Sequence, residues 1–88
     1  MIKVSRIEWL AGHRLRFRFN DESAGEYDFA RLVNESGSMV EPLRDLAYFQ
    51  RVFLEYGAPT WPNGFDVAPA WLHREIAAAS SLVRPAVA

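Results

Sequence analysis

The segment RLRFRF, residues 14–19, constrains the fold of this chain most, because arginine alternates with a large apolar side chain throughout it. Successive side chains of a β-strand point to opposite faces of a sheet. This period of two therefore predicts a strand with one buried and one solvated face. The solvated face of that strand carries Arg14, Arg16 and Arg18.

Two flanking segments repeat this alternation of charged and apolar side chains. Upstream, residues 6–9 read RIEW, and downstream, residues 26–29 read EYDF. Gly12 can supply the left-handed position of a three-residue hairpin loop between the first two strands. Residues 20–24 form a polar loop before the third strand. The simplest fold for this region is a three-stranded β-meander.

The pairing of these strands is predictable, because an acceptable register must keep the apolar side chains on one face. For the first two strands, the expected apolar pairs are Trp9 with Leu15 and Ile7 with Phe17. For the second and third strands, they are Phe17 with Tyr27 and Leu15 with Phe29. The charged residues then pair as well: Arg16 with both Glu8 and Asp28, and Arg18 with Glu26.

Arg14, Arg16 and Arg18 form a row of positive charge that could be taken for a phosphate-binding surface. The expected register places Arg16 between two acids and so neutralises the row. Exposed cross-strand ion pairs of this kind contribute only about 0.2 to 1 kcal/mol each. We therefore predict a solvated, ion-paired face, and anion or DNA binding by these arginines is the alternative.

The middle of the chain predicts a loop and a short helix. Residues 30–41 contain an apolar turn followed by Asn, Ser and Gly, which indicates a loop that crosses an edge of the sheet. Asp45 can cap a helix of at most two turns. This helix is expected to direct Leu46, Phe49 and Phe53 inward.

Two short strands and a longer helix complete the expected fold. Residues 52–56 are rich in β-forming side chains, so we predict a strand there with a partner near residues 60–61. Beyond Pro69, a helix presents an apolar stripe made of Trp71, Leu72, Ile76 and Ala79. Pro85 disfavours further helix. We expect one domain over residues 1–80 and a loose tail over residues 81–88.

The stretch TWPNGFDVAPAW, residues 60–71, combines a turn with a helix start. Its Pro-Asn-Gly at residues 62–64 has turn chemistry, because proline presets φ and both following residues tolerate left-handed geometry. Ala68 is the expected N-cap, since the residue before a proline avoids the α region. Asp66 is placed to accept N–H groups of the first helical turn.

The alternative interpretation of this stretch is functional, because aromatic side chains beside polar groups are typical of binding hot spots. The candidate interaction residues are Trp61, Asn63, Asp66 and Trp71. A small-molecule site near Asp66 is a further hypothesis.

Composition excludes several kinds of site. The net charge of −1 and pI near 6.1 lack the positive field that dominates binding to nucleic acids. The chain has no cysteine, so disulfides, thiolate metal sites and a cysteine nucleophile are ruled out. His13 and His73 have no metal-ligand spacing and are expected at the surface. The serines lack a nucleophile-elbow pattern. We therefore expect no catalytic site, cofactor or metal.

The start of the chain and its apolar runs bear on location. Residues 1–9 carry charges and no apolar h-region, and no apolar run approaches the ~18 residues of a membrane span. By elimination, we expect a cytoplasmic protein.

Two segments, EPLRDLAYFQRV and TWPNGFDVAPAWL, resemble the small bacterial proteins of the domain of unknown function 2442 family. The resemblance covers about residues 2–76. The matching positions are Pro42, Leu43, Arg44, Asp45, Phe49, Trp61, Pro62, Asn63, Gly64, Asp66, Pro69 and Leu72. The chain departs from the pattern at Leu46, where the family commonly has proline, and at NDES, which replaces a tighter Asp-Gly turn.

The resemblance implies an α+β fold with a small antiparallel sheet and no established catalytic residues. It also implies an antitoxin-like role, because such proteins often look like partners of another small protein. Together with the residues, it predicts a three-stranded N-terminal meander and one or two further strands, packed by a short central helix and a C-terminal helix.

For function, we predict a non-enzymatic protein–protein interaction module. It is expected to form a homodimer, to bind a small protein partner, or both. Its motivation is the lack of a catalytic arrangement in a chain with 14% aromatic residues. The alternatives are a DNA-binding regulator that uses the arginine face and a small-molecule-binding domain near Asp66.

Overall fold

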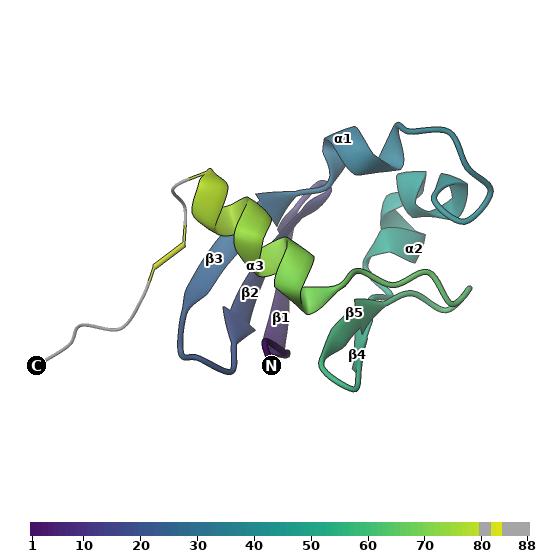
Figure 1. The fold of residues 1–88 in the computed structure, drawn as a ribbon. Coiled ribbons are helices and arrows are strands. Elements are labelled where there is room, and N and C mark those ends of the chain that lie inside the picture. Colours follow the sequence, from purple (N-terminus) through teal and green to yellow (C-terminus); the bar gives the residue numbers. More distant parts are fainter. Residues whose placement is uncertain (80–81, 84–88) are drawn as a thin grey trace, which may run out of the picture.

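An antiparallel meander forms the larger sheet of the computed structural model, which describes residues 1–79 and 82–83. Its strands are β1 (Val4–Ala11), β2 (Arg14–Phe19) and β3 (Ala24–Asp28), in that spatial order (Figure 1). In β2 the apolar side chains are buried and the arginines are exposed, as the alternation predicted. The meander of the predicted α+β fold is thus confirmed.

The register of β1 on β2 is confirmed, whereas that of β2 on β3 was predicted wrongly by two residues. The observed apolar pairs between β1 and β2 are Ile7 with Phe17 and Trp9 with Leu15. Those between β2 and β3 are Leu15 with Tyr27 and Phe17 with Gly25. Because side chains alternate with a period of two, both registers keep the same residues on the buried face. The alternation therefore does not distinguish them.

The turn between β2 and β3 decides the register. The N–H of Phe19 donates to the carbonyl of Ser23 at 2.8 Å, and that of Glu22 donates back to Phe19 at 3.0 Å. Glu22 adopts a left-handed φ of 70°, which closes the turn tightly. β3 therefore begins at Ala24, earlier than the pairing predicted from the sequence requires.

Three short helical segments follow β3: α1 (Ala30–Val33), the 3₁₀ segment η1 (Glu41–Arg44) and α2 (Leu46–Phe49). α1 occupies the start of the segment that was predicted to be a loop, because Asp28 Oδ1 accepts the N–H of Ala30 at 2.9 Å and initiates the turn. Asp45 caps α2 as predicted, accepting the N–H of Ala47 at 3.1 Å.

The inward side chains of the α2 region were predicted only in part. Phe49 is fully buried, but Leu46 is 42% exposed and Phe53 is 45% exposed. α2 is a single turn and presents Phe49 to the core, while Phe53 belongs to the following strand. A short helix has too few residues to form a continuous apolar stripe.

A two-stranded sheet confirms the strand expected near residues 52–56. It consists of β4 (Phe53–Glu55) and β5 (Ala58–Thr60), joined by a tight turn. The N–H of Val4 donates to the carbonyl of Gly57 at 2.8 Å. A Cβ atom on Gly57 would lie 2.7 Å from Lys3 Cβ. Glycine in this turn therefore allows the hairpin to dock against the start of β1.

α3 (Pro69–Ala78) crosses one face of the meander (Figure 1). Ala68 is its N-cap, with the extended φ of −64° and ψ of 124° that the following proline favours. Leu72 and Ile76 are buried as predicted. Ala79 is exposed, contrary to prediction, because the helix ends one residue before it.

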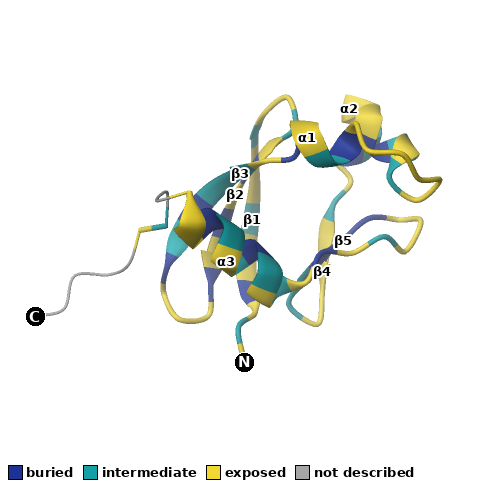
Figure 2. Ribbon diagram, turned by 45° about the horizontal axis from the view of Figure 1, so that its top comes forward, coloured by how far each residue is buried: buried dark blue, intermediate teal, exposed yellow. Residues whose placement is uncertain are grey.

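One hydrophobic cluster joins the meander, the helices and the segment after β5, and Figure 2 shows buried residues on strands and helices alike. Its members are Val4, Leu15, Phe17, Phe19, Phe29, Val33, Leu43, Phe49, Trp61, Val67, Leu72 and Ile76. Within the predicted tail, Leu82 packs against this cluster and Val83 bridges to Ala24. Residues 81 and 84–88 of that tail lie outside the described residues. Among the described helices, none is long and apolar enough to cross a membrane.

Candidate functional site

Trp61, the first candidate interaction residue, lies in the core. Its side chain is fully buried, and its indole Nε1 donates to the carbonyl of Phe49 at 2.9 Å. The two rings lie with their centroids 5.6 Å apart. The proposed surface role of Trp61 is therefore corrected: the indole joins α2 to the segment that follows β5.

Asn63 uses both ends of its amide on the main chain. Its Nδ2 donates to the carbonyl of Met39 at 3.0 Å, and its Oδ1 accepts the N–H of Phe65 at 3.1 Å. Gly64 completes the turn with a φ of 90°. The predicted turn is confirmed, and Asn63 additionally ties it to the loop between α1 and η1.

Asp66 does not act as the predicted helix cap. No side chain caps the first turn of α3, and Asp66 forms an isolated β-bridge with Thr60. This bridge holds Asp66 in an extended segment, two residues before the N-cap. Because Trp61 and Asn63 are engaged internally, the residues expected to form a small-molecule site with Asp66 do not converge there.

Trp71 belongs to a different part of the molecule from Trp61. It is half-buried on α3, where its ring meets Tyr27 of β3 edge-on at 5.7 Å. The described residues show no ring contact between the two tryptophans. The four candidate residues therefore do not form one surface.

The arginines of β2 form the predicted ion-paired face. Arg14 lies 3.6 Å from both Glu26 and Asp28. Arg16 lies 3.3 Å from Glu8 and 3.2 Å from Glu26. Arg16 is thus between two acids, but the second is Glu26 instead of the predicted Asp28, because β3 is shifted by two residues. The shared acids compensate the charge that DNA binding would use.

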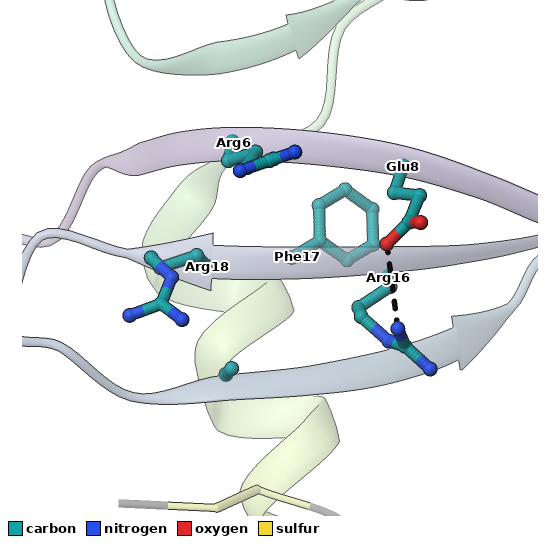
Figure 3. A pocket seen from close by; sticks show the side chains of 6 residues that line it. Arg6, Glu8, Arg16, Phe17 and Arg18 are labelled. Atoms are coloured by element: carbon teal, nitrogen blue, oxygen red, sulfur yellow. Dashed lines mark hydrogen bonds and ion pairs between the residues drawn. The ribbon is translucent and has the colours of Figure 1, made fainter. Parts of the chain in front are cut away.

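Arg18 has a different environment. Ala24 lies opposite it in place of the predicted Glu26, and its ion pair with Glu22 is long, at 3.8 Å. On the other side, Arg6 of β1 is its cross-strand neighbour. The two arginines flank a depression of about 270 Å³ (Figure 3). The confirmed β1–β2 register places Arg6 opposite Arg18. The small Ala24 on the other side of Arg18 follows from the shift of β3, which the sequence did not reveal.

A serine, a histidine and an aspartate meet where the β2–β3 turn touches α3. His73 Nε2 lies 3.0 Å from Asp21 Oδ2 and 3.3 Å from Ser23 Oγ. Ser23 Oγ also donates to Asp21 Oδ1, and this hydrogen bond is the main reason that the pKa of Asp21 falls to about 2. His73 was expected at the surface, but it packs edge-on against Phe19 at 4.9 Å.

This triplet does not have the geometry of a nucleophilic triad. A triad uses both ring nitrogens, one toward the serine and one toward the acid. Here both contacts involve the same Nε2 of His73, and Ser23 is fully buried. The cluster therefore fastens the turn to the helix.

His13 is also less exposed than predicted. Its Nε2 lies 2.9 Å from the carbonyl of Leu43, and its ring meets Phe49 edge-on at 4.7 Å. The packing of η1 and α2 against the β1–β2 hairpin creates this site, and no local pattern announces it. Across the part of the chain that the structure describes, no group of three metal-binding side chains could hold a metal ion.

β3 is an outer strand of the meander. The N–H of Ala24 donates to the carbonyl of Val83 at 2.8 Å, and the N–H of Val83 donates to the carbonyl of Ala24 at 2.7 Å. The N–H of Phe29 donates in the opposite direction, to the β1–β2 hairpin, at 2.8 Å. Since main-chain groups alternate along a strand, those of Glu26 and Asp28 point away from β2. They have no hydrogen-bond partner among the described residues.

A groove of about 740 Å³ runs along this edge. One side presents apolar surface from Tyr27, Ala79 and Val83. The other side presents the ion-paired Arg14, Arg16, Glu26 and Asp28. Burial raises the pKa of the Tyr27 phenol, which keeps it neutral. The groove thus combines one apolar and one charged wall with main-chain groups that are unpaired within the described part of the chain.

Comparison with protein families gives a match over residues 4–78, to the family described as "Protein of unknown function (DUF2442)". Comparison with curated proteins and with solved structures gives no match. The matched range contains both sheets and all of α3.

Proposed function

This chain belongs to the DUF2442 family of proteins of unknown function, and we propose that it is a non-enzymatic module that binds an extended segment of a small protein partner along β3. The hydrogen bonding at this edge carries the proposal. Val83 pairs with Ala24 as an antiparallel strand does, and the next outward residues, Glu26 and Asp28, have unpaired main-chain groups within the described chain. Such an edge can bind a peptide by strand addition.

The polar side chains around the groove support binding more than catalysis. Arg14 and Glu26 form an ion pair at 3.6 Å across neighbouring strands. Ser23, whose hydroxyl lies 3.3 Å from His73, is fully buried and donates to Asp21. A serine nucleophile needs access to substrate, and burial denies Ser23 this access.

The two walls of the groove specify the partner segment. Side chains of an added strand alternate between the face of Glu26 and Asp28 and the face of Tyr27 and Ala79. The acids are partly exposed and favour cationic side chains opposite them. The other face favours apolar side chains. We therefore propose a segment in which basic and apolar residues alternate.

A second copy of this chain fits the same edge less well. Antiparallel pairing of β3 with its symmetry mate would place Glu26 and Asp28 beside the same acids of the other copy. Like charges directly opposite each other destabilise a strand pair. A complex with another protein is therefore the favoured form of the proposal, and an antitoxin-like role is the special case in which that protein is a toxin.

The test uses a short synthetic peptide of alternating valine and lysine, with a valine–glutamate peptide as control. Amide hydrogen exchange followed by NMR should slow at Glu26 and Asp28 when the valine–lysine peptide is added in excess. Glu26→Pro, which removes one outward N–H, should weaken binding. Unchanged exchange at both amides, or equal protection by the two peptides, would contradict the proposal.

Sedimentation velocity without peptide distinguishes binding of another protein at this edge from binding of a second copy of this chain. The hetero-complex version predicts no concentration-dependent dimer. A dimer whose formation slows exchange at Glu26 and Asp28 would show that a second copy occupies the edge, and would overturn the hetero-complex version.

A further inference from the structure

We propose that Arg6 and Arg18 together bind one phosphate group of a small molecule on the solvated face of the meander. This site adjoins the β3 groove, with which it shares Arg16 and Ala24, but Arg6 and Arg18 line only this site (Figure 3). Arg6 and Arg18 are direct cross-strand partners. The Cβ atoms of two residues in such positions lie about 5 Å apart, which is close enough for both guanidinium groups to contact one phosphate.

The ion pairs on this face single out these two arginines. Arg14 and Arg16 each contact two acids. Arg6 makes no ion pair within the described residues, and Arg18 has only the long contact with Glu22, whose side chain is 71% exposed. Two adjacent positive charges therefore lack the compensation that the rest of the face has, and an anion would supply it.

Arg6 and Arg18 pair in the same register as Ile7 with Phe17 and Glu8 with Arg16. The register between β1 and β2 shifts between Val4 and Arg6, so Ser5 is the extra residue opposite β2. Its hydroxyl donates to the carbonyl of Arg18 at 3.2 Å and so fixes the irregular segment to β2. The regular register, which ends at this bulge, makes like charges face each other. Such an arrangement weakens a strand pair unless a ligand occupies it.

The depression between the arginines leaves room for the ligand. Ala24, the cross-strand neighbour of Arg18 on β3, is small and leaves the floor open. Glu8 also lines the depression, but Arg16 holds it at 3.3 Å, which compensates its charge (Figure 3). Phosphate suits the remaining donors, because guanidinium groups bind its oxygens in a bidentate manner.

The experiment measures the melting temperature with and without inorganic phosphate, with chloride added to keep ionic strength constant. A ligand that binds the folded state raises the melting temperature. We expect phosphate to stabilise the wild type and to have no effect on Arg6→Gln or Arg18→Gln. Without phosphate, Arg6→Gln should melt higher than the wild type, since it removes the like-charge contact.

Arg14→Gln is the matched control, because it removes an arginine of the same face that is already ion-paired. It should keep the phosphate response. Loss of that response in Arg14→Gln, a normal response in Arg6→Gln, or no response in the wild type would overturn the proposal.

Two further ligands test whether the site prefers a phosphate to a carboxylate or to nucleic acid. Acetate at equal ionic strength should have a weaker effect than phosphate, and an equal effect would overturn the choice of phosphate. Duplex DNA, titrated at low and at high salt, should not bind to the protein more tightly than inorganic phosphate does. Tight, strongly salt-dependent DNA binding that requires Arg6 would assign the site to nucleic acid instead.

Discussion

The WPNGFD stretch, residues 61–66, and β3, residues 24–28, use their hydrogen-bonding groups in opposite ways. In the first, Trp61 and Asn63 bond to main-chain carbonyls far away in the sequence. In the second, the outward groups of Glu26 and Asp28 find no partner within the described residues. The more conspicuous sequence is therefore the structural one, and the less conspicuous strand carries the binding role that we propose.

The largest effect that sharpens this comparison is expected at Trp61. Trp61→Ala removes a fully buried ring and leaves the carbonyl of Phe49 without its donor, so it should lower the free energy of unfolding by about 3 to 5 kcal/mol. Urea denaturation measures this. Trp71→Ala is the control, and its half-buried ring should cost roughly half as much. Equal losses would show that the two tryptophans are not as different as their burial indicates.

The second prediction concerns the orientation of β3. At residue 27 the N–H faces β2, so Tyr27→Pro should be about 2 to 3 kcal/mol less stable than Tyr27→Ala. At residue 26 the N–H faces outward, and the difference between Glu26→Pro and Glu26→Ala should be below about 1 kcal/mol. Chemical denaturation of the four variants provides both differences. The reverse order would mean that the open edge is assigned to the wrong residues.

The third prediction divides the WPNGFD stretch itself. Asn63→Ala removes hydrogen bonds to Met39 and Phe65 and should cost about 1 to 2 kcal/mol of stability. Asp66→Ala should change it by less than about 0.5 kcal/mol, because no side chain caps α3. Thermal and urea unfolding of both variants would check this. A large loss in Asp66→Ala alone would restore the capping role that the sequence suggested.

The smallest effect is an acid-dependent loss of stability at Asp21. Its folded pKa of about 2 lies below the ordinary 3.8, so the stabilisation is fully present above pH 3.8 and is lost as the pH falls through about 2. Because the carboxylate is 31% exposed, solvent screening limits the loss to about 1 kcal/mol. Urea titrations across this range should show it in the wild type. In Asp21→Asn this component of the pH dependence should be missing, and an unchanged profile would contradict the assignment.

The elements were largely predictable because each has a local cause. Alternation in residues 14–19 yields β2, Asp45 caps α2, and the proline after Ala68 starts α3. The β1–β2 register followed from the requirement that apolar pairs share a face. The β2–β3 register did not, because a shift by two residues preserves that pattern and the turn at Glu22 selects between the alternatives.

The candidate sites were less predictable because they depend on contacts between distant segments. The burial of His73 requires α3 to meet the β2–β3 turn, and that of His13 requires η1 to meet the first hairpin. The predicted β1–β2 register places Arg6 beside Arg18, but the lack of an acid opposite Arg18 on β3 depends on the turn between β2 and β3. Side-chain type predicted the face in each strand and missed the neighbours across β2 and β3.

By itself, the sequence determined the α+β class, the ion-paired face of β2 and the turn and helix start around Asn63, since these depend on local periodicity and backbone preference. Only the tertiary structure decided that Trp61 is internal, that the outward groups of Glu26 and Asp28 have no partner within the described residues and that Arg18 faces Ala24 instead of Glu26. The physical reason is that exposure and pairing are set by whichever distant segment packs against a residue, and neither composition nor period records that choice.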